Sequence, residues 1–283
     1  MKHFYMVVNS EKKNAERGAE LIEAYLEEQG CECLRWQEEA AKSREYKYTD
    51  GRLVPPETEC VISLGGDGTM IQAARDLAGR NIPLFGVNMG NLGYLTQISQ
   101  ESDIVPALDE LIADHYRLEK RMMLYGRVIS DGKTVASDIS LNDIVLTRES
   151  LYTLRFRLYL NGQLFNEYSA DGMIASTPTG STAYNLSAGG PIAAPESDMI
   201  ILTPICPHTL NSRSIVISSK SRIMLEMLDQ RDVNPILTFD GDVAVPLKKG
   251  DRIEIEKSEI ETTLVQLKQV PFLENIRQKM RQI

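Results

Sequence analysis

The sequence has little cysteine, histidine, tryptophan and positive charge. Its 283 residues include four Cys, three His and one Trp, and 31 Lys and Arg residues stand against 40 Asp and Glu residues, a formal net charge of −9. The cysteines, at positions 31, 33, 60 and 206, have neither the spacing of a disulfide framework nor that of a zinc site, so we expect reduced thiols. The acidic surplus argues against a nucleic-acid partner, which requires a basic face.

Long hydrophobic runs are also absent. No uncharged apolar stretch reaches the roughly 18 residues that suggest a membrane-spanning helix. The first ten residues lack the apolar segment and small-residue cleavage site of a signal peptide. We therefore expect a cytoplasmic protein without a membrane partner.

The chain changes character near residue 120. Before that point strand-like and helix-like segments alternate, as in βαβ units on a parallel sheet. The expected strands are 4–8, 60–64 and 82–87, and the expected helices are 12–29, 70–77 and 103–112, with no clear element over 34–56. Beyond residue 120 the segments are short and β-rich, among them 123–130, 134–147, 153–160, 252–255 and 264–267. Asp131-Gly132 and Asn161-Gly162 have the composition of hairpin turns.

These patterns predict two domains and a tail. At roughly 150 residues per domain the length also suggests two domains. We expect an α/β domain with a Rossmann-like parallel sheet over 1–120 and a β-rich domain over 121–262. A tail over 263–283, with a final helix opened by Pro271, should pack on the first domain.

The first chemical motif is Gly65-Gly66-Asp67-Gly68-Thr69, between a predicted strand and a predicted helix. Glycines let a ligand approach the backbone closely, and N–H groups at a helix N-terminus favour phosphate. A carboxylate repels phosphate but can orient a hydroxyl and accept its proton, so Asp67 suits phosphoryl transfer. The alternative is a tight turn in which Asp67 caps the helix.

The second motif is rich in hydroxyl groups. The 25 residues from Asp171 to Pro195 contain one charged side chain, Asp171, and many Ser and Thr side chains. Such a segment suits the base and sugar of a bound nucleotide, or else forms a packing seam of small residues. Asn142-Asp143 interrupts a strand-like run, and this pair could hold the hydroxyls of a ribose or simply end a strand.

Together these motifs resemble the NAD kinase family, whose members phosphorylate the 2′-hydroxyl of the adenosine ribose of NAD. The resemblance rests on GGDGT at 65–69, the Asn-acid pair at 142–143, and Asp171-Gly172 followed by STPTGSTAY at 176–184. The segments at 88–94 and 207–213 are also similar to family segments. The resemblance implies transfer of the γ-phosphoryl of ATP to NAD, giving NADP, with Mg²⁺ or another divalent metal accompanying ATP.

The resemblance also implies a role for each site residue. Asp67 would accept the hydroxyl proton, and Gly65, Gly66, Gly68 and Thr69 would form the phosphate loop. Asn142 and Asp143 would hold the nicotinamide-side ribose. The nucleotide pocket would be lined by Asp171, Thr182, Ala183, Tyr184 and Ser187, with Tyr184 near the adenine. No residue is assigned as a resident metal ligand, and a homodimer or homotetramer is implied.

Three positions depart from the family pattern. Asp143 stands where Glu is usual, and the Glu side chain is one methylene longer than that of Asp. Ser169 and Asp242 stand where a basic residue and Gln are common. Two other functions remain open at this point: a lipid kinase, disfavoured by the polar segment at 176–184, and a non-catalytic dinucleotide-binding module, disfavoured by the carboxylate of Asp67.

Overall fold

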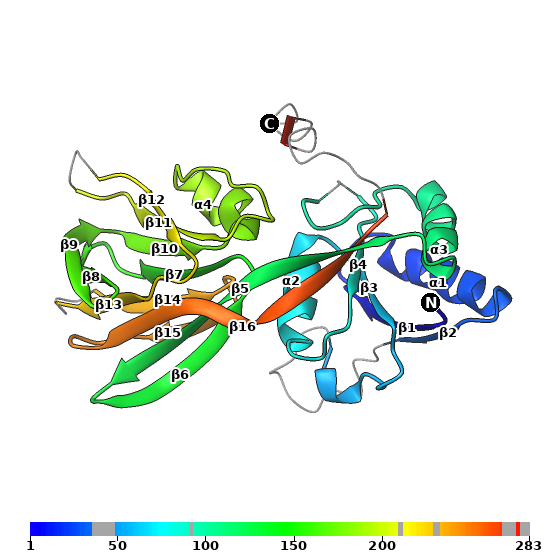
Figure 1. Ribbon diagram of the computed structural model, residues 1–283, viewed down its shortest axis with the longest axis horizontal. Helices are drawn as coiled ribbons and strands as arrows, with labels where there is room; N and C mark the ends of the chain where they lie inside the picture. Colours follow the sequence, from blue (N-terminus) through cyan, green and yellow to red (C-terminus); the bar gives the residue numbers. More distant parts are fainter. Residues whose placement is uncertain (36–48, 91–92, 209–211, 229–232, 268–275, 278–283) are drawn as a thin grey trace. The chain divides into compact units, whose positions relative to one another are not determined.

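The computed structural model describes residues 1–35, 49–90, 93–208, 212–228, 233–267 and 276–277. The chain divides into two compact units (Figure 1). Unit 1 comprises Met1–Lys120 together with Thr262–Ile283, and unit 2 comprises Arg121–Glu261. None of the helices in these described ranges is both long enough and apolar enough to cross a membrane.

Unit 1 contains the parallel sheet that the alternating segments predicted. Its strand order is β2-β1-β3-β4, followed by the end of β16, and every neighbouring pair is parallel. The strands are β1 (His3–Val8), β2 (Glu32–Arg35), β3 (Cys60–Leu64), β4 (Leu84–Val87) and β16 (Arg252–Gln266). The helices are α1 (Ala15–Glu28), α2 (Asp67–Asp76) and α3 (Ile104–Ile112), with 3₁₀ turns η2 (Gly51–Leu53) and η3 (Glu101–Asp103).

The core of unit 1 explains why these segments fold as they do. All five residues of β3 are buried, as expected for a strand covered on both faces. Helix α1 buries Ala19, Ile22 and Leu26 at helical spacing against the sheet. Val265 of β16 belongs to the same core, so the expected return of the C-terminal segment to the first domain is confirmed.

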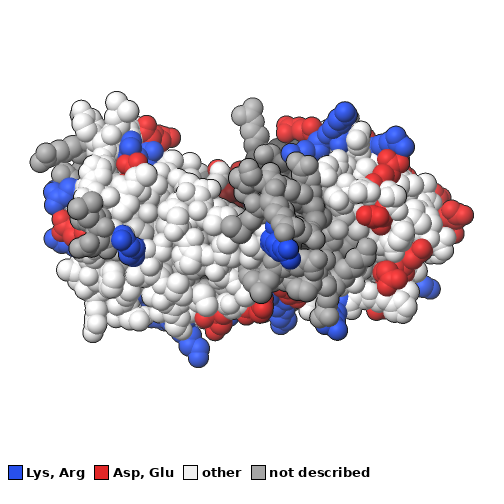
Figure 2. All heavy atoms as spheres, turned by 90° about the horizontal axis from the view of Figure 1, so that it is seen from above, with Lys and Arg blue, Asp and Glu red and all other residues white. Residues whose placement is uncertain are grey.

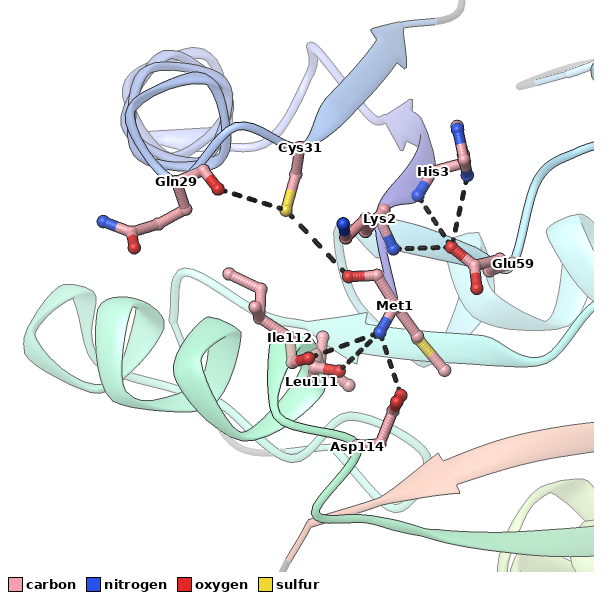
Figure 3. A network of polar contacts seen from close by, with 9 residues as sticks. All are labelled: Met1, Lys2, His3, Gln29, Cys31, Glu59, Leu111, Ile112 and Asp114. Carbon is pink, nitrogen blue, oxygen red and sulfur yellow. Dashed lines mark hydrogen bonds and ion pairs between the residues drawn. The ribbon is translucent and has the colours of Figure 1, made fainter.

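The amino end of the chain contacts the end of α3. The Met1 amino nitrogen lies 2.9 Å from an Asp114 carboxylate oxygen (Figure 3). It also donates to the carbonyl oxygens of Leu111 and Ile112, both at 3.4 Å. These carbonyls end α3, where the helix dipole favours a cation. The contact therefore ties β1 to the C-terminus of α3.

Unit 2 is β-rich, as predicted, and is built from antiparallel pairs. One sheet has the order β12-β11-β10-β7-β14-β15. In the other sheet the first part of β16 is followed by β13, β8 and β9 in that order, and β5 pairs with both β16 and β6. The strands are β5 (Arg117–Ser130), β6 (Lys133–Ser140), β7 (Asp143–Arg148), β8 (Leu154–Leu160), β9 (Gln163–Ala170), β10 (Gly172–Ser176), β11 (Met199–Ile205), β12 (Ile215–Ser218), β13 (Ile223–Met227), β14 (Pro235–Phe239) and β15 (Val243–Pro246). Two short helical turns, η4 (Thr179–Thr182) and α4 (Tyr184–Ser187), follow β10.

The two sheets of unit 2 share one hydrophobic core. Leu146 and Phe239 come from the first sheet, and Phe156 and Leu225 come from the second. All four are at most 1% exposed, so the sheets pack face to face.

Several expected boundaries were right and others were wrong. Both predicted hairpin turns are present, with positive φ at Asp131-Gly132 and at Asn161-Gly162. The segment 134–147 is not one strand, because β6 and β7 are separated at residues 141–142. Residues 252–255 and 264–266 belong to a single strand, β16, which ends one residue before the predicted end at 267. Strand β2 falls partly in the segment for which no element was expected. The helix expected from Pro271 lies outside the described residues.

Candidate functional site

The glycine-rich loop of unit 1 follows β3, next to the point between β1 and β3 where the strand order of the sheet reverses. The chain leaves β1 toward β2 on one side and leaves β3 toward β4 on the other, and open α/β sheets bind ligands at such a point. Asn9, just after β1, donates its backbone N–H to Leu64 at 2.9 Å and its side-chain amide to the Thr69 hydroxyl at 3.2 Å. The carboxyl ends of both central strands are therefore joined to the start of α2.

Asp67 is the first residue of α2, and its carboxylate is fixed by backbone N–H groups. Tyr94 N donates to Oδ2 at 2.6 Å, and Leu95 N donates to Oδ1 at 3.0 Å. The N-cap residue of α2 is Gly66, and the carboxylate of Asp67 bonds the backbone at 94–95. Each carboxylate oxygen has a further lone pair, so the group can still accept a proton.

Close packing leaves no room for a side chain at two glycines of this site. A Cβ on Gly93 would lie 1.9 Å from Oδ1 of Asp67, and a Cβ on Gly65 would lie 2.2 Å from the Thr69 hydroxyl. Gly66 and Gly68 have open space around them, and Gly68 is exposed. Burial, and secondarily the charge of Asp67, raises the pKa of the nearby Tyr94 hydroxyl. Gly65 and Thr69 thus shape the loop, while Gly66 and Gly68 leave its outer side accessible.

Unit 2 contains a pocket of about 270 Å³ beside the inner strands β7 and β14 of its six-stranded sheet. It is lined by Asn142, Asp143, Val145, Thr147, Ala183, Tyr184, Thr238, Asp240 and Gly241. Four of the residues predicted to bind nucleotide therefore lie together: the Asn-acid pair, Ala183 and Tyr184. Asp171, Thr182 and Ser187 are not among the lining residues.

Asp240 organises this pocket from the turn between β14 and β15. Its carboxylate accepts three successive backbone N–H groups, from Leu141 at 2.8 Å, Asn142 at 2.7 Å and Asp143 at 3.1 Å. In return, Asp240 N donates to the Asp143 carbonyl at 3.0 Å. These bonds hold open the break between β6 and β7. Nothing in the sequence around Asp240 indicated this contact.

Asp143 is the least solvated acid of the pocket. Its side chain is 5% exposed and has no hydrogen-bond partner among the described residues, although it lines the pocket. Burial, and then the charge of Asp240, raises the pKa of Asp143 to about 7. Asp143 therefore takes up a proton near neutral pH.

Much of the hydroxyl-rich segment serves the fold itself. The Thr177 hydroxyl donates to the Leu141 carbonyl at 2.6 Å and accepts Gly180 N at 3.0 Å. The Ser181 hydroxyl bonds both backbone groups of Ala193, and Ser176 is fully buried. The structure thus supports the packing-seam interpretation for these three residues.

Asn185 joins the two ends of this segment and was not singled out from the sequence. Its side-chain amide donates to the carbonyls of Ser181 at 3.1 Å and Pro191 at 3.0 Å, and its oxygen accepts the Thr203 hydroxyl at 2.7 Å. The side chain is fully buried. It therefore fixes the turn that carries Ala183 and Tyr184.

The remaining predicted residues are not part of the pocket lining. Asp171 precedes β10 and forms an ion pair with Arg148, with Nε and Oδ1 2.8 Å apart. The hydrogen bond to Asp171 raises the pKa of Arg148, against the lowering effect of burial. The Thr182 hydroxyl donates to the Thr179 carbonyl at 3.3 Å, and Ser187 is exposed at the end of α4.

The acids of the described residues do not form a metal cluster. No group of three or more His, Cys, Asp or Glu side chains in this part of the chain is arranged to hold a metal ion. The carboxylate oxygens of Asp67 and Asp240 instead accept hydrogen bonds from backbone N–H groups.

Comparison with known proteins gives consistent matches along the chain. Residues 2–116 match the ATP-NAD kinase N-terminal domain, and residues 141–267 match the ATP-NAD kinase C-terminal domain. The chain is 44% identical to the NAD kinase of Lachnospira eligens over 99% of this chain and 100% of that protein. It is 42% identical to the NAD kinase of Agathobacter rectalis over 99% of both.

Two solved structures share the fold. A yeast NADH kinase complexed with NADH superposes with a TM-score of 0.85 and 23% identity, over 99% of this chain and 88% of that chain. An NAD kinase from Archaeoglobus fulgidus in complex with ATP gives a TM-score of 0.78 and 24% identity over the full length of both.

The protonation of Asp143 predicts a pH-dependent stability. An acid whose pKa is higher in the folded state than in the unfolded state binds more protons when folded, so its contribution to stability is lost as pH rises from about 4 to 8. Asn at this position cannot ionise. The free energy of unfolding of Asp143→Asn, relative to wild type, should therefore rise by about 2–4 kcal/mol between pH 4 and pH 8.

Urea denaturation at both pH values measures this difference. Asp242→Asn is the matched control, because Asp242 lies exposed in the same turn as Asp240 and should show little pH-dependent change. A difference between Asp143→Asn and wild type that does not vary with pH would contradict the assignment.

Proposed function

The chain belongs to the NAD kinase family, and we propose that Asp67 accepts the proton of the NAD hydroxyl that it phosphorylates. The protein is an enzyme that uses ATP to convert NAD into NADP, which carries its extra phosphate on the 2′-hydroxyl of the adenosine ribose. In the reaction the hydroxyl oxygen bonds to the γ-phosphorus of ATP, the bond to the β-phosphate oxygen breaks, and ADP leaves. The hydroxyl proton passes to a carboxylate oxygen of Asp67.

The observation that carries this proposal is the fixed carboxylate of Asp67. Two backbone N–H groups hold it at the N-terminus of α2 without consuming all of its lone pairs. A carboxylate in a phosphate-binding loop is unfavourable for binding alone, because it repels the phosphates. Its presence there supports a role toward the acceptor hydroxyl and disfavours a pure binding module.

We assign the phosphate groups of ATP to the backbone of the loop Gly65, Gly66, Gly68 and Thr69. The first N–H groups of a helix have no partner within the helix, and the helix dipole favours an anion there. The open space around Gly66 and Gly68 supports a close approach. Mg²⁺ arrives as the ATP complex and supplies further positive charge for the γ-phosphoryl group.

We assign the NAD-binding side to unit 2. Asn142 and Asp143 hold the nicotinamide-side ribose, and Tyr184 lies near the adenine. The pocket that brings Asn142, Asp143, Ala183 and Tyr184 together supports this assignment. Asp171, Thr182 and Ser187 complete the nucleotide site in this proposal, and Asp171 acts with its ion-pair partner Arg148.

We place the enzyme in the cytoplasm on the evidence of its cysteines. Cys31, Cys33, Cys60 and Cys206 are free thiols. Burial raises the pKa of Cys33 to about 12 and raises that of Cys60 as well, so neither thiol is activated. A reducing compartment suits these thiols.

We further propose that the enzyme is a homodimer or homotetramer. The face of unit 2 that carries α4 and β12 bears few charged side chains (Figure 2). Tyr184 and Val216 are 45% and 50% exposed there, and β12 is an edge strand. Exposed apolar side chains on such a face favour packing against a second copy of the chain.

Replacing the proposed base should stop the reaction while preserving the fold. Asp67→Asn keeps one acceptor oxygen for the loop but cannot accept the proton, so kcat should fall by about 10²–10⁴-fold. The assay contains NAD, ATP and Mg²⁺ and detects NADP with an NADP-specific dehydrogenase. NAD affinity and circular dichroism should stay close to wild type, and wild-type turnover in this variant would disprove the role of Asp67.

A methyl group placed against Asp67 provides a second test of the same site. Gly93→Ala would force its Cβ against Oδ1 of Asp67 and displace either the carboxylate or the loop, so kcat should fall at least about tenfold. Gly90→Ala is the matched control, because its Cβ would lie at an ordinary 3.7 Å from Asn88. Equal turnover of the two variants would contradict the positional requirement.

The mass of the protein in solution tests the proposed oligomer. Sedimentation equilibrium of the wild-type chain should give two or four times 31.7 kDa. Val216→Glu should shift the distribution toward the single chain, whereas Val135→Glu, at an exposed position of β6, should not. A wild-type mass of 31.7 kDa at micromolar concentration would overturn this proposal.

A further inference from the structure

Two adjacent lysines follow the first strand of unit 1 and belong to none of the motifs described above. Lys12 and Lys13 lie in the turn between β1 and α1, and both are exposed. Neither ammonium group has an ion-pair or hydrogen-bond partner among the described residues. Two positive charges therefore stand side by side without a matching acid.

Other basic side chains of unit 1 are matched with acids. The ion pairs are Arg17–Glu101, Arg35–Glu16 and Arg52–Asp50. Glu11 precedes the lysines in the same turn, but in the described part of the chain its carboxylate pairs with neither of them. In a chain with 40 acids and 31 Lys and Arg residues, a lysine pair without an acid is a feature that requires an explanation.

The turn that carries the lysines is tied to the glycine-rich loop. Lys12 N donates to the Asn9 carbonyl at 3.0 Å, and Ala15 N donates to the Lys12 carbonyl at 3.1 Å. Asn9 donates its side-chain amide to the Thr69 hydroxyl at 3.2 Å and its backbone N–H to Leu64 at 2.9 Å. These bonds place the turn at the carboxyl end of the sheet, next to the start of α2.

We propose that Lys12 and Lys13 bind the phosphate groups of ATP and complete the phosphate site alongside the glycine-rich loop. The inference rests on the proposed function, which assigns these phosphates to the loop at 65–69. Each lysine has a flexible four-carbon stem, so its ammonium can extend from the turn toward an anion on the neighbouring loop. Lysine commonly binds nucleotide phosphates, where it acts as a point charge.

The lysines offset the unfavourable charge of Asp67. Its carboxylate repels the phosphates that the loop N–H groups attract, and the helix N-terminus supplies only about half a positive charge. The partners of Asp67 in the described structure are Tyr94 N and Leu95 N, so neither lysine neutralises it. Two ammonium groups on the neighbouring turn provide attraction for ATP and leave Asp67 to the acceptor hydroxyl.

Removing both charges should weaken ATP binding without stopping the reaction. The double variant Lys12→Gln with Lys13→Gln should bind ATP about tenfold more weakly in a calorimetric titration with Mg²⁺ present. KM for ATP should rise by a similar factor. The lysines bind the ground state and the transition state alike, so kcat and KM for NAD should stay close to wild type.

Two further variants separate the charge from a structural role. Lys12→Arg with Lys13→Arg keeps both charges and should retain ATP affinity. Lys2→Gln is the matched loss of charge, because Lys2 lies exposed at the opposite, amino end of β1, and it should bind ATP as wild type does. Raising the salt concentration should weaken ATP binding more in the wild type than in the double glutamine variant.

Asp67→Asn distinguishes this inference from the phosphate assignment on which it rests. Removing a negative charge beside the phosphates should tighten ATP binding about threefold. Tighter binding in Asp67→Asn together with wild-type affinity in the double glutamine variant would overturn the role of the lysines and leave the phosphate assignment in place. Wild-type affinity in both would overturn the two together, and an equal loss in Lys2→Gln would assign the effect to net charge and refute the lysine site.

Discussion

The pocket of unit 2 depends on one carboxylate, that of Asp240, which accepts the N–H groups of residues 141, 142 and 143 in succession. The turn that presents it runs through positive φ at Asp240 and Gly241. Without this acceptor, three backbone donors at the break between β6 and β7 would lose their partner, at a cost of about 1–3 kcal/mol for each donor left buried. The strand break, and with it the direction of Asn142 and Asp143, follows from this contact.

The same contact supports the hydroxyl-rich segment. The Asn142 carbonyl accepts Thr177 N at 2.8 Å, and Gly180 packs so closely on it that a Cβ there would lie 2.2 Å from that oxygen. Asn185 then closes the segment from its other end. The position of Ala183 and Tyr184 in the pocket is thus set by a chain of backbone contacts that begins at Asp240.

Backbone N–H groups also hold the other functional acid. Asp67 and Asp240 both accept successive main-chain N–H groups. This explains how a chain with a net charge of −9 can serve two phosphorylated substrates. We propose that helix N–H groups contact the phosphates, while the carboxylate of Asp67 interacts with the acceptor hydroxyl.

The sequence predicted the parts of the fold and site that depend on local chemistry. Alternating strands and helices indicated the parallel sheet, and Asp131-Gly132 and Asn161-Gly162 indicated their hairpins, because these features depend on adjacent residues. Asp240 could not be recognised in this way, since it lies 98 residues from Asn142 and only the folded sheet joins them. Nor could residue type alone show that Thr177 and Ser181 bond the backbone, because a hydroxyl serves a ligand or the main chain equally well.

The central claim is that burial, and then the nearby Asp240, raises the pKa of Asp143 to about 7. Its most direct test is the pKa of Asp143, read from the carboxyl ¹³C shift in an NMR titration of the ligand-free protein with ¹³C-labelled aspartate, the resonance being assigned with Asp143→Asn. The account predicts a midpoint of about 7 in the wild type, which moves down in Asp240→Asn as the like charge is removed. A wild-type midpoint near 4, the ordinary value for Asp, would contradict it.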